Sequence, residues 1–436
     1  MGKKGRNEGT EKRSRRIKDP FTFLSNQFES IDRETAKRHI FYLILASLLA
    51  KLIVIFVTTN VFHSFVDEFD LGIYFKHGMM LAQGQMPYDS EFGYPILVFI
   101  PILLALIPAF LLQDAMAFLF SFQVLMVLCD IVTVVCVYLV SLKIWNERTA
   151  YHAGLLYTAS FSAAYFVITK YDAFPTAFLM VGLVSLLYGR DTLGYLASVL
   201  GFFTKVFPGL AAPFFVFYNA KGSSLKQEVI AAAKVIIPVS VILFLPLFLI
   251  QRSTLNIYIP IRSDLGYYSN TATFTLFSWI HDVLGINISI GEISLLMYFI
   301  MGAGILFLMY LAYRSPKKDP KLLVKLLLCA IVLTVICSRV RSPQYIVWFT
   351  PLICILAADE IKKIVSLFVF QGLAYIEFPL MFGAFYVATS YTSPALSGGW
   401  FLALAEFTLE NLALLFCLWI VIEPIEVYRT FKNNQN

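Results

Sequence analysis

Long apolar segments follow one another along nearly the whole chain, and this feature constrains the fold more than any other. They lie at residues 40–62, 94–111, 115–142, 150–169, 172–188, 193–203, 206–218, 229–250, 293–313, 322–337, 343–358, 364–388 and 400–422. A helix needs about 20 apolar residues to cross the hydrocarbon core of a bilayer. Because these segments are continuous and not alternating like barrel strands, we predict an all-α polytopic membrane protein with about 12–13 transmembrane or re-entrant helices.

The composition excludes a soluble enzyme. Hydrophobic residues make up 59% and charged residues 14% of the 436 residues, whereas soluble domains have about 45–50% and about 25%. The six cysteines lie inside apolar segments without metal-ligand spacing, so we interpret them as core residues. The net charge of +6 arises largely from a basic N-terminal segment, so it does not indicate a nucleic-acid partner.

This basic segment sets the predicted domain organisation and orientation. Residues 1–39 are polar and basic, so we expect a disordered cytoplasmic arm that contacts membrane lipids. Residues 40–422 form the predicted transmembrane domain, with 63–94 as the first outer loop, and 423–436 form a cytoplasmic tail. We therefore expect a multi-pass protein of the cell (cytoplasmic) membrane whose N-terminus is cytoplasmic.

The loops after the second and third apolar segments conflict with a simple alternation of spans. Two full crossings at 94–111 and 115–142 would place Lys143 and Arg148 outside, against the positive-inside rule. The prolines of 94–111 favour a kinked or re-entrant segment that does not cross fully. If the segment 193–218 also forms two short helices that bend near Lys205, one outer face then holds three ionisable residues, namely Lys170, Asp172 and Lys205.

Ionisable residues near or within apolar segments are the candidate site, because each costs a few kcal/mol in lipid unless it faces a partner or a cavity. Each also has a structural alternative. The acids of the first outer loop could be a solvated loop, and Lys170 and Asp172 a mutually neutralising pair. Lys205 could snorkel to the surface, and the two arginines of 338–342 could anchor headgroups. The candidates are Asp67, Glu68, Asp70, Lys170, Asp172, Lys205, Arg339 and Arg341.

Carboxylates and cations at one outer face suit a particular chemistry. A carboxylate can deprotonate a hydroxyl while Lys205, Arg339 and Arg341 stabilise a departing lipid phosphate. The chain contains no P-loop, no G-x-S-x-G element and no H-E-x-x-H zinc pattern, so nucleotide hydrolysis and serine-nucleophile chemistry have no support.

Several short motifs resemble the GT-C superfamily of membrane glycosyltransferases. In chain order they are D-L-G-I-Y at 70–74 with G-Q-M-P-Y at 84–88, K-Y-D-A-F-P at 170–175, Gly189-Arg190, K-V-F-P at 205–208 and S-P-Q-Y-I-V-W at 342–348. The order most resembles glycosyltransferase family 87, the polyprenyl-phosphate-mannose-dependent mannosyltransferases, and the GPI mannosyltransferase I group. The chain departs from the family's Y-P-P pattern, because Tyr94-Pro95 is followed by Ile96.

The resemblance implies a GT-C-type fold with a catalytic first outer loop and inverting transfer of a hexose, most often mannose. The donor would be a polyprenyl-phosphate sugar, the acceptor a lipid or glycan, and the active site extracytoplasmic. Asp70 becomes the expected general base, with Asp67 and Glu68 as competitors. Lys205, Arg341 and Arg339 would bind the donor phosphate. Tyr74, Asp172, Lys170, Gln344 and Tyr345 would contact sugar or acceptor.

Neither the motifs nor the resemblance requires a cofactor. If a divalent metal such as Mg or Mn binds, Asp67 and Asp70 are its expected ligands.

Two other classes of protein remain open from the sequence. A secondary transporter or lipid flippase for a glycolipid or an anionic substrate would place charges near the midplane of several helices. The charges described above gather at one face instead, which favours the enzyme. A non-catalytic assembly subunit would tolerate the loss of every acid in the first outer loop.

Overall fold

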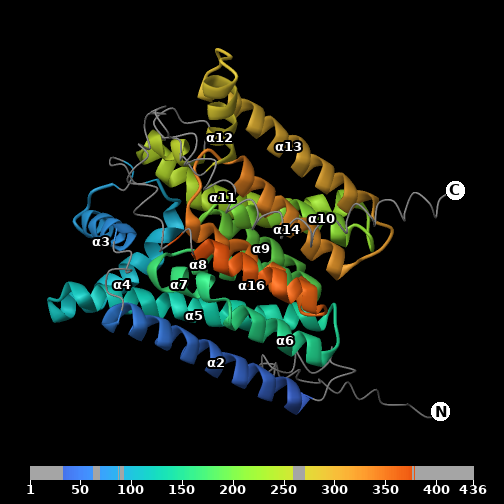
Figure 1. The fold of residues 1–436 in the computed structure, drawn as a ribbon, viewed down its shortest axis with the longest axis horizontal. Helices are drawn as coiled ribbons and strands as arrows, with labels where there is room; N and C mark the ends of the chain where they lie inside the picture. The colour runs from blue at the N-terminus through green and yellow to red at the C-terminus, as the bar shows by residue number, and fades with distance from the viewer. Residues whose placement is uncertain are drawn as a thin grey trace, which may run out of the picture.

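The computed structural model describes residues 33–61, 69–86, 88, 93–258, 271–375 and 378. Across these residues all regular structure is helical (Figure 1). The basic arm up to residue 32, the acids Asp67 and Glu68, the expected span at 400–422 and the C-terminal tail lie outside the described residues.

Five of the described helices are long and apolar enough to cross a membrane. They are α2 (Arg33–Asn60), α5 (Ala115–Leu142), α11 (Leu225–Ile250), α13 (Ile290–Arg314) and α14 (Pro320–Cys337). The pair α7 (Phe161–Thr169) and α8 (Ala173–Leu187) makes a sixth if it is one span, although it is bent by 116°. The protein is therefore an all-α, multi-pass membrane protein, as predicted.

Several of the predicted spans form shorter helices. The α-helices are α3 (Phe69–Ala82), α4 (Phe99–Leu112), α6 (Glu147–Thr158), α9 (Asp191–Phe202), α10 (Ala211–Asn219), α12 (Ala272–Ser278), α15 (Ile346–Ala357) and α16 (Ile361–Tyr375). Short 3-10 segments are η3 (Ile96–Val98), η4 (Phe207–Leu210), η5 (Arg252–Tyr258) and η7 (Pro343–Tyr345), and η6 (Trp279–Val283) is π-helical.

The conflict over residues 143–148 is resolved by the way α5 packs on α2. His39 of α2 lies 3.4 Å from the Tyr138 hydroxyl of α5 and 3.5 Å from Glu147. Farther along, Ser47 of α2 bonds Asp130 of α5. The two helices are therefore antiparallel, and α5 begins at the end of the bundle where α2 finishes. The intervening α3 and α4 make no net crossing, as the re-entrant interpretation predicted.

The turns after α7 and α9 lie at one end of the bundle, which we call the site end. The other end, where His39 of α2 lies 3.5 Å from Glu147, is called the opposite end.

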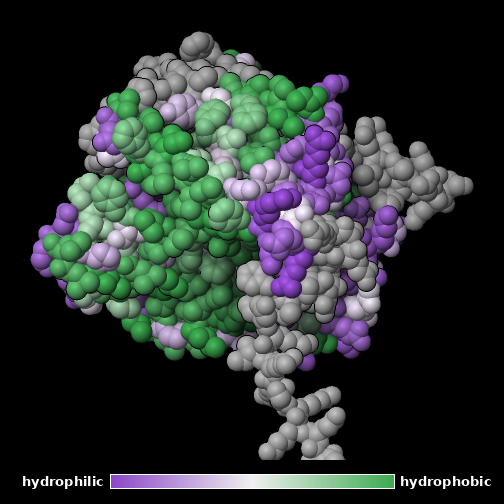
Figure 2. Space-filling view, turned by 90° about the horizontal axis from the view of Figure 1, so that it is seen from below, coloured by the Kyte–Doolittle hydropathy of each residue, from purple (hydrophilic) through white to green (hydrophobic). Residues whose placement is uncertain are grey.

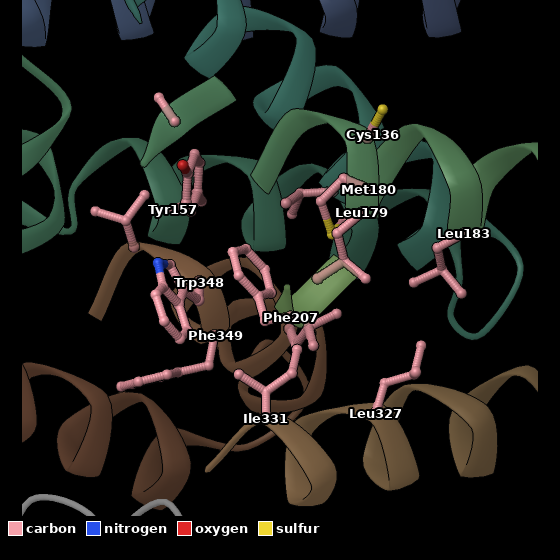
Figure 3. Packing of buried hydrophobic residues seen from close by; sticks show 14 of the residues in the cluster. Cys136, Tyr157, Leu179, Met180, Leu183, Phe207, Leu327, Ile331, Trp348 and Phe349 are labelled. Carbon is pink, nitrogen blue, oxygen red and sulfur yellow. The ribbon is translucent and has the colours of Figure 1, made fainter. Parts of the chain in front are cut away.

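The core surrounds α15, whose twelve residues are all buried. Side chains of α8 and α14 pack around it, including Leu179, Met180 and Ile331, and the ring of Trp348 stacks on Phe207 with centroids 4.4 Å apart (Figure 3). The described cysteines Cys129, Cys136, Cys329, Cys337 and Cys354 are free and lie buried or half-buried, as their interpretation as core residues predicted.

The outer surface is apolar where lipid would contact it. Helix α2 exposes a row of large apolar side chains, among them Phe41, Ile53 and Phe56. Figure 2, viewed from the side of α2, shows that hydrophobic residues dominate this face. Such a surface is unfavourable in water and favourable in a bilayer, which agrees with the membrane assignment.

Candidate active site

Asp70 and Lys170 form the first ion pair of the site end. Asp70 lies in the first turn of α3, and its Oδ2 is 2.7 Å from Nζ of Lys170, which ends α7. Tyr74, one helical turn after Asp70, donates a hydrogen bond of 3.5 Å to the same Oδ2. Both charged side chains are largely buried, so the pairing offsets the cost of removing each charge from water.

Asp172 and Lys205 form the second ion pair. Lys205 Nζ lies 2.5 Å from Asp172 Oδ1, and the indole N–H of Trp348 donates to the same oxygen. The sequence around Lys205 offers no acid within four residues, and its partner comes from 33 positions earlier. Lys170 thus pairs with Asp70 and Asp172 with Lys205. The interpretation of Lys170 and Asp172 as a mutually neutralising pair is wrong.

Three aromatic rings surround the Lys205 ammonium. Its Nζ lies 4.7 Å from the ring centroid of Tyr171, 5.1 Å from that of Tyr345 and 4.8 Å from that of Trp348. Each distance allows a cation–π interaction. Lys205 lies in the turn between α9 and η4, where burial lowers its pKa and Asp172 raises it. We call Tyr171, Tyr345 and Trp348 the aromatic cage.

A second layer of rings joins α3 to the cage. The ring of Tyr171 makes edge contacts with Tyr74 at 5.7 Å and with Tyr94 at 5.1 Å between centroids. Tyr345 stacks on Trp348 at 3.9 Å. Tyr171 therefore lies between the residues of α3 and the cation that η7 and α15 help to hold.

Helix breaks place these side chains. Lys170 is extended, with φ −128° and ψ 156°, and ends α7 just before the 116° bend. Asp172 precedes the first residue of α8 but makes no side-chain cap there, and its carboxylate is directed to Lys205. The tight turn at Lys205 requires Gly201, because a Cβ at that position would lie 2.6 Å from Pro208 Cβ.

The remaining predicted cations lie in the segment between α14 and η7. Arg339 and Arg341 are 3% and 7% exposed, whereas headgroup anchors would extend from the protein surface. Gln344 is also buried and accepts a hydrogen bond from the Ser342 hydroxyl. This segment leads directly into Tyr345 of the cage.

The Gly189-Arg190 element lies away from this site. Tyr188, just before it, donates a hydrogen bond of 3.0 Å to the carbonyl of Leu139 near the end of α5. Gly189 has φ +72°, a conformation that favours glycine. This element is a turn at the opposite end, and its place in the motif order reflects the connection between α8 and α9.

The described residues offer no metal centre. Among them, no group of three or more His, Cys, Asp or Glu side chains could hold a metal ion. Asp70 faces the Lys170 ammonium at 2.7 Å, and this positive charge opposes binding of a cation at the same carboxylate. Asp67, the other predicted ligand, lies outside the described residues, and no step below passes through a metal.

No protein-family model matches this chain, and no curated protein matches it.

Sequence reasoning missed two parts of the polar interior. One is the aromatic cage, because the motifs contain Tyr171 and Trp348 but do not indicate that these rings surround a cation. The other is the buried pair of Lys51 in α2 and Asp130 in α5, joined at 2.8 Å. Lys51 and Asp130 are ionisable residues within apolar segments, so the criterion that identified Lys205 also applies to them.

Proposed function

We propose that this protein is a GT-C-type glycosyltransferase that transfers a hexose, which the motifs indicate to be mannose, from a polyprenyl-phosphate donor to a lipid or glycan acceptor. One observation carries the proposal. The segments 70–74, 170–175, 205–208 and 342–348, far apart in the sequence, meet around the two ion pairs and the aromatic cage. They are four of the motif segments on which the resemblance rests; Gly189-Arg190 lies at the opposite end of the bundle.

In this proposal Asp70 is the general base. The acceptor hydroxyl transfers its proton to the Asp70 carboxylate while its oxygen bonds to the anomeric carbon of the hexose. The bond from that carbon to the phosphate oxygen breaks on the other side, and the polyprenyl phosphate leaves with the electron pair. A single displacement of this kind inverts the anomeric configuration. Lys170, 2.7 Å away, holds the Asp70 carboxylate in place.

Lys205 binds the donor phosphate in this proposal, together with Arg341 and Arg339. An ammonium held between a carboxylate and three rings has a fixed position, so it is preorganised for an anion. Tyr74, which bonds Asp70, Tyr345, which lies beside Lys205, and Gln344, next to Tyr345, are the groups proposed to contact sugar or acceptor.

The proposal also includes a location. We infer that the protein resides in the cell membrane with its N-terminus cytoplasmic and the site end extracytoplasmic. The uneven distribution of basic residues supports this orientation, since 11 of 34 Lys and Arg residues precede residue 39.

Replacing Asp70 tests the proposed base. We expect Asp70→Asn to lower turnover at least about 100-fold, since removing a general base typically costs this much or more. Membranes containing the protein would be incubated with labelled polyprenyl-phosphate mannose, and product formation measured. The matched control is Asp114→Asn, because Asp114 only caps α5 by accepting from the Met116 N–H and Asn caps helices equally well.

Asp70→Asn also leaves Lys170 without its ion-pair partner, so stability must be measured separately. The double variant Asp70→Asn with Lys170→Met removes both charges and is expected to regain thermal stability but not activity. Near-normal turnover by a folded Asp70→Asn protein would contradict the assignment of Asp70.

A further inference from the structure

Two polar atoms of the turn between α7 and α8 have no hydrogen-bond partner in the described part of the chain. They are the hydroxyl of Tyr171 and Oδ2 of Asp172. Both residues are 0% exposed. They are consecutive in sequence, and the Lys205 ammonium touches both, at 2.5 Å from Asp172 Oδ1 and 4.7 Å from the Tyr171 ring centroid.

The hydroxyl without a hydrogen-bond partner distinguishes Tyr171 from other buried tyrosines of the described residues. Tyr157 donates to Asp130 at 2.8 Å, Tyr188 to a backbone carbonyl at 3.0 Å, and Tyr74 to Asp70 at 3.5 Å. A buried polar atom without a partner lowers the stability of the fold, and such atoms in native proteins call for an explanation such as a ligand. A phenylalanine at position 171 would keep every ring contact and avoid the cost.

The chemistry of the two atoms selects the ligand that would satisfy them. The phenol donates its proton, and the carboxylate oxygen only accepts. An alcohol suits both atoms, because its oxygen accepts from a phenol and its hydrogen is donated to a carboxylate. A phosphate oxygen would be repelled by the carboxylate, and an ammonium could not accept from the phenol. Ligand hydroxyls are therefore the groups that fit both atoms.

We propose that Tyr171 and Asp172 recognise hydroxyls of the transferred hexose, with Tyr171 as a specificity-determining residue. This inference rests on the proposed function. It places the sugar next to the Lys205 ammonium, and the sugar of the donor is joined directly to the phosphate that Lys205 would bind.

Tyr171→Phe tests the inference because it removes only the hydroxyl. We expect kcat/KM for polyprenyl-phosphate mannose to fall about 10- to 100-fold, the effect of losing a hydrogen bond in a buried site. Competitive inhibition by polyprenyl phosphate without sugar should be unchanged, because the phosphate and Lys205 are unaffected. The melting temperature of the ligand-free protein should stay the same or rise, because an unpartnered hydroxyl has been removed.

Tyr188→Phe is the matched control, with the opposite expected signature. It removes a buried hydroxyl that bonds a backbone carbonyl at the opposite end, so its melting temperature should fall while kcat/KM stays unchanged.

Three outcomes would overturn a specific claim. If Tyr171→Phe lowers the melting temperature without changing kcat/KM, the hydroxyl bonds a buried water and not the sugar. If Tyr171→Phe weakens binding of the sugar-free polyprenyl phosphate as much as binding of the donor, the substitution disturbs Lys205 and not sugar recognition. If the wild-type protein turns over no polyprenyl-phosphate hexose, the proposed function itself fails.

Discussion

Asp172 is the residue on which the site end depends most. One of its oxygens accepts from the Lys205 ammonium and the Trp348 indole, and the other has no hydrogen-bond partner in the described part of the chain. A carboxylate with no exposure is stable in the folded protein only while its countercharge stays close. The same ion pair therefore supports both the fold and the proposed chemistry, and a mutation of either residue affects both.

These two roles of Lys205 can be separated. Lys205→Met leaves Asp172 buried without a countercharge, so we expect a loss of about 3–5 kcal/mol in unfolding free energy and a weaker affinity for the donor. In the double variant with Asp172→Asn the stability should largely return, whereas donor binding should not. Thermal unfolding and donor titration measure the two quantities. Unchanged donor affinity in the single variant would contradict the phosphate-binding role.

Residue by residue, the sequence predicted the chemistry-bearing groups but not their pairing. Lys205 was singled out as a cation in need of an anion, and the structure supplies Asp172. The partner could not be predicted, because it is set by the turn after α7, far away in the sequence. Tyr171 was missed for a related reason, since a tyrosine in an apolar segment looks like a core residue until its hydroxyl is found without a partner.

At the scale of elements, the attachment of α2 to the bundle rests on a narrow polar contact. Only five of its residues are buried, at positions 36, 43, 47, 51 and 58. Ser47 and Lys51 both bond Asp130 Oδ2, and Tyr157 donates to its other oxygen. In lipid, apolar side chains gain little by leaving the solvent, so polar contacts and close packing hold helices together. We therefore expect Lys51 and Asp130 to determine how α2 docks.

A double-mutant cycle tests this docking contact. Lys51→Met should cost about 3–5 kcal/mol of stability, since Asp130 is left buried without a countercharge. Adding Asp130→Leu should cost much less than the sum of the two single changes, and melting temperatures in detergent give the coupling. The control is Lys37→Met in the same helix, because Lys37 pairs with Glu34 on the exposed surface, where such a pair contributes about 1 kcal/mol or less. Additive single effects would exclude a specific pair.

The boundaries of the elements show where sequence patterns lose information. The segment 150–169 was predicted as one span, yet it divides into α6 and α7 around Ser160, whose hydroxyl bonds the Leu156 carbonyl. A helix break between apolar residues does not change the hydropathy of a segment, so hydropathy alone does not reveal the break. The two short helices expected around Lys205 were predicted correctly, because Pro208 and the charge interrupt the apolar pattern there.

At the scale of the whole molecule, the described ion pairs and lysine–ring contacts lie at three levels of the bundle. The two ion pairs of the site and the aromatic cage lie at the site end. The Lys51–Asp130 pair joins α2 and α5 near the middle of both helices. At the opposite end Lys143 lies over the ring of Tyr188 and Lys321 over that of Trp145. Burial lowers the pKa of Lys143 in the loop after α5. One site at one end suits an enzyme, whereas a transporter must open its site to both sides in turn.

Labelling with a membrane-impermeant maleimide tests this arrangement. In a background without the native cysteines, Gln83→Cys after α3 and Lys226→Cys at the start of α11 are both exposed positions. We expect Gln83→Cys to react in intact cells and Lys226→Cys only after permeabilisation. Reaction of both from the same side would contradict the predicted topology. Reaction of a site residue such as Tyr74→Cys from both sides would favour the transporter.

The sequence by itself determined that this protein lies in a membrane, that it is helical and which few charged residues are candidates for the site. The physical reason is that a segment in lipid must satisfy its own backbone hydrogen bonds, and that a charge in lipid is costly unless it faces a partner or a cavity. The tertiary structure decided which charges meet. Asp70 pairs with Lys170 across 100 positions of sequence, and Asp172 with Lys205 across 33. Lys51 of α2 pairs with Asp130 of α5. Such pairings depend on where helices break and which ends they share, and only the packed bundle fixes these.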